Sequence, residues 1–220
     1  MFSIGNNDYL SPFETNSIIF NSYTKEEYVD MVIDSFINVI KEVYKEGGRK
    51  FVIFSAVPLA CLPYSRALKF QQTNRTGCLK KFQVFTKIHN KILPKKLIEL
   101  EKTLQGFKYS YFDFFQAATD IIDHPSRYGF KEAKTACCGS GPYRGLSSCG
   151  GKRGKLKEYE LCKDVRDYMF FDNVHLIEKS NLHFATLLWN GDPNMVRSCS
   201  MKSLFHQVAY PQPEEVHLSM

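Results

Sequence analysis

The sequence predicts an α/β protein in which a parallel β-sheet lies between layers of helices. Apolar residues recur at helical spacing over residues 24–47. A nearly continuous apolar run then occupies residues 50–57, as expected for a strand buried on both faces of a parallel sheet. Helix and strand patterns continue to alternate up to residue 122, and this alternation is typical of parallel strands joined by crossover helices.

The chain begins with a short apolar stretch, residues 1–4, which we interpret as the end of a strand. It leads directly into Gly5-Asn6-Asn7-Asp8. In open α/β sheets ligands bind beyond the carboxyl ends of the strands. A glycine there permits a tight turn, and an asparagine amide can donate a hydrogen bond to a developing oxyanion. The alternative is an ordinary turn at the end of a strand.

The helix over residues 24–47 has the clearest limits. Thr24 and Glu27 form the pattern of a capping box, in which each residue satisfies a backbone amide of the other. The helical spacing continues to Gly47-Gly48, where we expect the helix to end. Pro58 closes the strand that follows.

Beyond a loop, apolar spacing predicts a second long helix over residues 79–104, kinked at Pro94. A strand over residues 108–112 and a short helix over residues 114–122 follow. Residues 123–163 are rich in glycine, cysteine and lysine and lack periodicity, which indicates a long loop.

The last part of the chain contains two further elements. Residues 167–171 form a short extended stretch in this interpretation, and residues 176–189 form a final helix. All 220 residues fit a single domain of ordinary globular composition, with 44% hydrophobic and 24% charged residues.

Composition also limits the partners. No segment reaches the roughly 18 consecutive apolar residues that a transmembrane helix requires. Residues 1–10 lack the basic start and the long apolar stretch of a signal peptide. The formal net charge of +6 is modest and no nucleic-acid-binding motif accompanies it, so we expect no nucleic-acid partner.

The seven cysteines favour disulfides and therefore the secretory route. A zinc site would need two short Cys-x2-4-Cys pairs, whereas here only Cys137 and Cys138 are close together. Cys61 with Cys78 is one expected bridge, and the cysteines at 137, 138, 149 and 162 allow three pairings, which leaves Cys199 free. Asn74-Arg75-Thr76 fits the glycosylation pattern.

Asp172 and His175 are the candidate acid–base residues. A carboxylate three residues before a histidine can bind the Nδ1–H of the imidazole and leave Nε2 free as a general base. We place both residues at the entrance of the final helix, where they share one face. The alternative is that Asp172 is only a helix N-cap and His175 a surface residue.

No activated nucleophile accompanies this pair. The sequence has no Gly-x-Ser-x-Gly motif; Ser140, Ser147 and Ser148 lie in the cysteine-rich loop. Cys137 and Cys138 are expected to be structural and not to act as thiol nucleophiles. Three other histidines are candidate bases. We interpret His89 as a residue on a helix surface, His124 as a loop residue and His183 as a similar surface residue.

Taken together and in this order, the motifs resemble the plant GDSL esterase/lipase family, a branch of the SGNH hydrolases. The likeness covers essentially the whole chain. The matching stretches are Phe2 to Tyr9, Cys61-Leu62-Pro63, Tyr111-Phe112-Asp113, His124 to Phe130, Ala136-Cys137-Cys138-Gly139 and Phe171 to His175.

The resemblance implies an α/β fold of the SGNH (flavodoxin-like) type, a three-layer α/β/α arrangement with a parallel sheet whose first strands are missing. It also implies that Asn7 donates to the oxyanion, Asp172 orients the imidazole and His175 is the general base, with no cofactor and no metal. The family's nucleophile lies in a Gly-Asp-Ser motif, which this sequence lacks. The chain is therefore expected to be an ester hydrolase by descent, inactive as written.

The resemblance suggests partners and a compartment as well. A small ester is the expected substrate if the chain is active. Residues 139–151 look like the crucifer branch that includes myrosinase-associated and epithiospecifier-modifier-like proteins. The alternative function is accordingly a non-catalytic interaction protein beside a glucosidase such as myrosinase. The family also implies an extracellular, secretory or vacuolar location.

Overall fold

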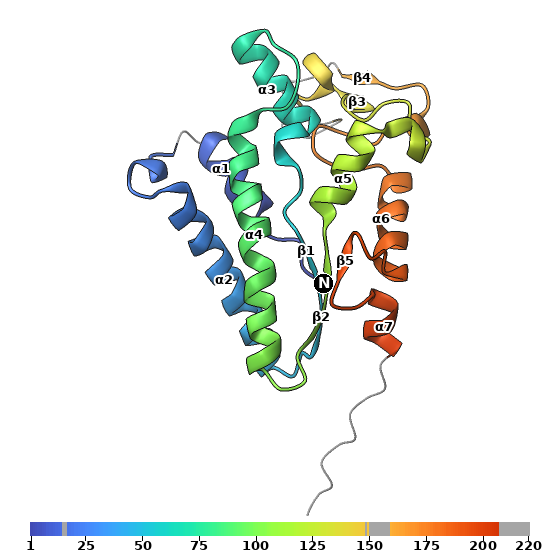
Figure 1. Cartoon of the computed structure of the whole chain (residues 1–220). Coiled ribbons are helices and arrows are strands. Elements are labelled where there is room, and N and C mark those ends of the chain that lie inside the picture. The colour runs from blue at the N-terminus through green and yellow to red at the C-terminus, as the bar shows by residue number, and fades with distance from the viewer. Residues whose placement is uncertain (15–16, 148, 150–158, 207–220) are drawn as a thin grey trace, which may run out of the picture.

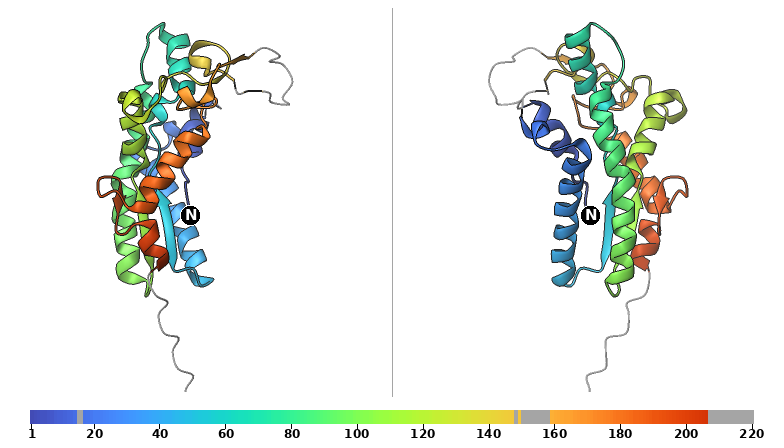
Figure 2. Two further views of the ribbon diagram at one scale, coloured as in Figure 1. Left: turned by 90° about the vertical axis from the view of Figure 1, so that its right-hand side faces the viewer. Right: turned by 60° about the vertical axis from the view of Figure 1, so that its left-hand side comes forward.

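The computed structural model describes residues 1–14, 17–147, 149 and 159–206. It has three layers, with a small central sheet between two groups of helices (Figure 1). The two further views in Figure 2 show the same layers from the side, with the N-terminus at one edge of the sheet. The predicted α/β/α architecture is therefore confirmed. Within the described part, no helix is long and apolar enough to cross a bilayer.

The centre of the sheet consists of β1 (Lys50–Phe54) and β2 (Lys108–Phe112), which pair in parallel as predicted. Both strands are buried over most of their length, which explains their continuous apolar sequence. The sheet differs from the prediction at β5 (Val196–Arg197), which pairs antiparallel with β2. The predicted parallel pairing is therefore confirmed, and β5, which was not predicted, makes the described sheet mixed.

The predicted strand at residues 1–4 is reduced to a single bridge in the structure. Phe2 pairs in parallel with Ile53. Its N–H donates to the carbonyl of Val52 at 2.7 Å, and its carbonyl accepts from Phe54 N–H at 3.0 Å. Helix α1 (Asn6–Glu14), which the sequence pattern did not indicate, begins immediately after Gly5.

Helices α2 (Lys25–Lys45) and α4 (Lys80–Thr103) pack against each other on one side of the sheet (Figure 1). The capping box at the start of α2 is present, because Thr24 and Glu27 bond to each other's backbone amides. The loop predicted between β1 and α4 contains a helix that periodicity did not reveal, α3 (Pro63–Thr73).

Helices α5 (Phe114–Asp123), α6 (Glu178–Asn190) and α7 (Met201–His206) lie on the other side of the sheet (Figure 1). The predicted helices at 114–122 and 176–189 are thus confirmed, whereas α7 was not predicted. The long loop contains a small antiparallel pair, β3 (Cys138–Gly139) and β4 (Glu160–Leu161). Short 3₁₀ turns occupy Ile19–Asn21, Leu59–Cys61, Pro125–Tyr128, Pro142–Arg144 and Val165–Asp167.

Six cysteines form three disulfides, Cys61–Cys78, Cys137–Cys162 and Cys138–Cys149. The first was predicted, and the other two select one of the three pairings that the sequence left open. Cys199 is a free thiol, as expected. Asn74 of the glycosylation pattern is exposed in a left-handed conformation at the end of α3.

Candidate active site

Asp172 and His175 lie in a tight turn and do not belong to the final helix. Phe171 N–H donates to the carbonyl of His175 at 2.8 Å, and this bond closes the turn. Helix α6 starts only at Glu178. The prediction that both residues share a helix face was therefore wrong, and so was the alternative that Asp172 caps the helix.

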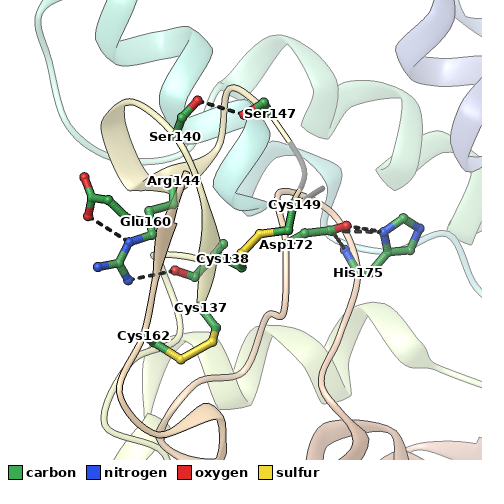
Figure 3. Close-up of a disulfide and its surroundings, with 11 residues drawn as sticks. Cys137, Cys138, Ser140, Arg144, Ser147, Cys149, Glu160, Cys162, Asp172 and His175 are labelled. Carbon is green, nitrogen blue, oxygen red and sulfur yellow. Dashed lines mark hydrogen bonds and ion pairs between the residues drawn. A yellow bond between two sulfur atoms is a disulfide. The ribbon is translucent and has the colours of Figure 1, made fainter. Parts of the chain in front are cut away.

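Within this turn the carboxylate of Asp172 binds both the backbone and the ring of the histidine. Oδ1 accepts the N–H groups of Val174 at 3.0 Å and His175 at 2.8 Å. His175 Nδ1 lies 2.9 Å from both carboxylate oxygens. Figure 3 shows the imidazole held against Asp172 in this way. With Nδ1 occupied, Nε2 is the nitrogen that can accept a proton from a nucleophile.

The environment of Asp172 favours its charged form. Burial by itself raises the pKa of this carboxyl. Hydrogen bonds from the His175 ring and from the N–H groups of His175 and Val174 outweigh burial and hold the pKa below its usual range. The His175 side chain is 75% exposed, so its ring is open to solvent.

Two neighbouring segments hold the turn in place. The N–H groups of Cys137 and Cys138 donate to the carbonyls of Phe170 and Phe171 at 2.9 and 2.7 Å. Cys137 and Cys138 are themselves bonded to Cys162 and Cys149, as Figure 3 shows. From the start of α3, Tyr64 N–H donates to the carbonyl of Asn173 at 3.0 Å. The disulfide-linked loop thus supports the backbone that carries Asp172.

His175 lines a groove of about 990 Å³ between β1 and α6. The groove is mainly apolar, as is common for sites that bind small organic ligands. Its other apolar walls include Phe54, Phe114, Val174, Leu176, Phe184, Leu188 and Trp189. The arrangement places the His175 imidazole at the edge of a mainly apolar groove.

The structure places Asn7 in the first turn of α1, with its side chain exposed. The preceding Gly5 has φ +99°, a backbone conformation that favours glycine. Asn6 accepts the N–H of Val57 at 3.0 Å, and Val57 lines a small cavity that Val174 also lines. Val57 therefore lies at the same cavity as the turn that holds His175. The role of Asn7 as an oxyanion donor stays a prediction.

His89 differs from its prediction as a helix-surface residue, because its side chain is completely buried. Burial lowers the pKa of this histidine to about 4. Its Nδ1 is hydrogen-bonded to the hydroxyl of Tyr9 at 2.7 Å. Helical spacing could have indicated burial, because His89 lies four residues after the buried Phe85 and four before the buried Leu93. His124 is exposed at the end of α5, as expected for a loop residue.

Among the described residues, the His175 ring is hydrogen-bonded to Asp172 and to no serine or cysteine. No hydrogen bond joins His175 Nε2 to a serine among the described residues, and Ser140 and Ser147 are bonded to each other at 2.8 Å. Cys137 and Cys138 are in disulfides. Ser3 lines the same groove as His175. Across the described ranges, no cluster of His, Cys, Asp or Glu is arranged to hold a metal ion.

Comparison with known proteins places this arrangement in a family. The sequence profile of the GDSL-like lipase/acylhydrolase family matches residues 1–188. GDSL esterase/lipase 3 of Arabidopsis thaliana is 45% identical over 93% of this chain and 55% of its own length. A GDSL lipase of Tanacetum cinerariifolium is 40% identical, over 93% of this chain and 52% of its own length. An inactive GDSL esterase/lipase-like protein 25 of Arabidopsis thaliana is 35% identical, over 91% of this chain and 45% of its own length.

The chain thus spans about half the length of the curated relatives that it matches. The matched residues include the Asp172–His175 turn, the Gly5–Asp8 loop and the disulfide-linked loop between them. The likeness therefore covers the turn, the loop and all but the far end of the groove described above. On these grounds the chain belongs to the GDSL-like lipase/acylhydrolase family.

Proposed function

We propose that this chain provides the acid–base part of a serine ester-hydrolase site. The observation that carries the proposal is the bond between Asp172 and Nδ1 of His175, which leaves Nε2 available at the edge of an apolar groove. In such a site Nε2 takes the proton of a serine hydroxyl while its oxygen attacks the ester carbonyl. Nε2 then returns the proton to the leaving alcohol. Asn7 is the proposed donor to the carbonyl oxygen in the intermediate.

We further propose that the 220 residues by themselves do not carry out this reaction. The sequence contains no Gly-Asp-Ser motif, and Ser3 is the serine of the described residues that shares the groove with His175. Loss of a serine nucleophile costs roughly a factor of 10⁶ in kcat in the subtilisin example. One relative carries the word inactive in its name, so loss of activity has a parallel among the relatives.

A fluorophosphonate probe tests both statements, because it reacts covalently with activated serines. The 220-residue protein should not be labelled and should not hydrolyse p-nitrophenyl butyrate. A chimera should be labelled if a relative's segment with the Gly-Asp-Ser motif is joined in front of Met1. His175→Ala should abolish the labelling of this chimera.

His124→Ala is the matched control, because His124 is an exposed histidine outside the turn. Its chimera should retain labelling. Labelling of the unmodified chain that depends on Ser3 and His175 would refute the inactive state. A folded chimera that the probe does not label would refute the acid–base role of His175.

The secretory route is the compartment that we propose for this chain. Three disulfides support it, because such bonds persist in oxidising compartments. Asn74 is exposed at the end of α3, where an attached glycan would meet no buried surface. No contact or surface in the described residues favours a glucosidase such as myrosinase as partner, so that association stays a prediction.

A further inference from the structure

A buried polar pair lies against the Gly5–Asp8 loop. Tyr9 belongs to α1 and His89 to α4, and both side chains are completely buried. The Tyr9 hydroxyl and His89 Nδ1 are joined by a hydrogen bond of 2.7 Å. Their rings meet edge to face with 5.6 Å between centroids. Burying a polar group costs free energy unless it is hydrogen-bonded, and the Tyr9–His89 bond offsets part of that cost. Neither residue contacts the Asp172–His175 pair through a hydrogen bond.

Gly5 brings the loop into contact with this pair. A Cβ at Gly5 would lie 3.2 Å from Cε1 of His89 and 3.7 Å from Cε2 of Tyr9. The φ of +99° at Gly5 also excludes most other residues. The backbone of the loop at Gly5 therefore packs closely against the imidazole of His89.

The residue after His89 holds the second side of the loop. Asn90 accepts the N–H of Ala56 at 2.8 Å and donates to the carbonyl of Ala56 at 3.0 Å. The next residue, Val57, donates its N–H to Asn6 at 3.0 Å. His89 and Asn90, which are consecutive in α4, therefore hold the loop from two sides. His89 packs against Gly5. Asn90 binds Ala56, and the next residue, Val57, binds Asn6.

The chain is also held after Asn7. The Tyr28 hydroxyl of α2 donates to the carbonyl of Asp8 at 2.9 Å. Tyr9 then begins the buried part of α1. Asn7 is therefore an exposed residue between neighbours that are fixed on both sides, which is the arrangement expected for a preorganised donor.

We propose that Tyr9, His89 and Asn90 are positioning residues that fix the orientation of Asn7. The use of Asn7 as an oxyanion donor rests on the proposed function, whereas the support of the loop does not. Burial lowers the pKa of His89 and raises the pKa of Tyr9, so the pair stays uncharged near neutral pH. A neutral pair supports the loop without placing a buried charge beside Gly5.

Tyr9→Phe tests the proposal because it removes one hydroxyl and keeps the ring. In the 220-residue protein with its disulfides intact, NMR would follow the side-chain amide of Asn7 and the backbone amide of Val57, which is bonded to Asn6. Hydrogen exchange of the Val57 amide should become about tenfold faster, as expected for loss of one buried hydrogen bond. The Asn7 side-chain signals should shift.

Tyr44→Phe is the matched control. Its hydroxyl donates to the carbonyl of Gln105 at 2.8 Å, near the opposite end of α2. This variant also loses one tyrosine hydrogen bond but should leave the Asn7 signals unchanged. A purely structural role of Tyr9 would raise exchange throughout the molecule and not only at Val57.

Two substitutions of the histidine complete the test. His89→Asn keeps an acceptor near the position of Nδ1, whereas His89→Ala removes it. The Asn7 signals of His89→Asn should lie closer to those of the unsubstituted protein. If His89→Ala does not fold, Tyr9→Phe decides the question. Unchanged Asn7 signals and exchange rates in Tyr9→Phe would overturn the proposal, and because no ester is used, absent hydrolysis would bear only on the proposed function.

Discussion

The two halves of the candidate site are held in different ways. In the Asp172–His175 turn, the hydrogen bonds of the Asp172 carboxylate join residues no more than three positions apart. In the Gly5–Asp8 loop they join residues that are distant in sequence, with separations of 51 residues for Asn6–Val57 and 80 for Tyr9–His89. The bonds between Asp172 and His175 are thus local, although the disulfide-linked loop and Tyr64 also hold the backbone of the turn. The bonds of the second half depend on the packing of α1, β1 and α4.

This difference has consequences for stability. A local turn orders few residues, so a change in it affects a few hydrogen bonds and little else. The Gly5–Asp8 loop packs against the buried imidazole of His89 and is therefore coupled to the core. A larger side chain at Gly5 or a proton on His89 would disturb the close-packed residues around the imidazole. We therefore expect substitutions or protonation at the loop to reduce the free energy of unfolding more than changes in the turn.

The largest expected effect is the protonation of His89. Its pKa is about 6.5 in the unfolded chain and is lowered to about 4 by burial in the folded protein. The unfolded state therefore binds a proton first as the pH falls. The neutral His89 therefore contributes its full stabilisation above about pH 6.5. The free energy of unfolding falls by about 3 kcal/mol as the pH is lowered to about 4. Urea unfolding at a series of pH values measures this loss.

His89→Asn identifies the source of this pH dependence, because an amide does not titrate in this range. The variant should show a smaller loss of stability between pH 6.5 and 4, whatever its stability at neutral pH. Burial lowers the pKa of His183 in the same direction, so His183→Ala serves as the control and should remove a smaller part. An unchanged pH dependence in His89→Asn would show that the loop is not coupled to the core in this way.

The next effect in size concerns Gly5→Ala, compared with Gly47→Ala. Both glycines have similar positive φ values, +99° and +96°, but a Cβ at Gly47 would meet nothing within 4 Å. Gly47→Ala should therefore cost about 1 kcal/mol from backbone strain alone. Gly5→Ala should cost about 2 kcal/mol, because its Cβ also presses on the buried His89. Equal losses in the free energy of unfolding, measured with urea, would mean that the His89 imidazole moves aside without cost.

Most of the fold was predictable because its signals are local. The capping box at Thr24, the apolar run of β1 and the helical spacing of α4 each depend on near neighbours, and the structure contains all three. Helix α3 was missed because its apolar spacing is weak and its burial depends on the disulfide-linked loop. Strand β5 has two residues, too few for a periodic pattern.

The site shows the same division. The Asp172–His175 contact follows from a spacing of three residues, although its turn was mistaken for the start of α6. The position of His89 depends on α4 packing against α1, which adjacent residues do not specify. The pairing of Cys137 with Cys162 likewise depends on contacts between distant residues. Strand β4 pairs with β3, and this brings Cys162 N–H to the carbonyl of Cys137.

The smallest expected effect is that of Asp172→Asn. The amide keeps an acceptor for the backbone N–H groups but loses the charge, and a charge-assisted bond exceeds a neutral one by about 1 kcal/mol. The exposed His175 ring limits the loss through solvent screening, so we expect at most about 1 kcal/mol in urea unfolding at pH 7. Asp167→Asn, which breaks a pair with the 80% exposed Lys131, should cost less, about 0.5 kcal/mol or below.

The pH dependence of the Asp172→Asn effect separates it from the His89 effect. Because the folded pKa of Asp172 is lowered, its stabilisation is present above pH 3.8 and is lost as the pH falls through the folded value. The difference between Asp172→Asn and the unsubstituted protein should therefore persist between pH 6.5 and 4, where protonation linked to His89 reduces stability. A loss from Asp172→Asn that exceeds the loss from Gly5→Ala would reverse the comparison, because the local turn would then be the half coupled to the core.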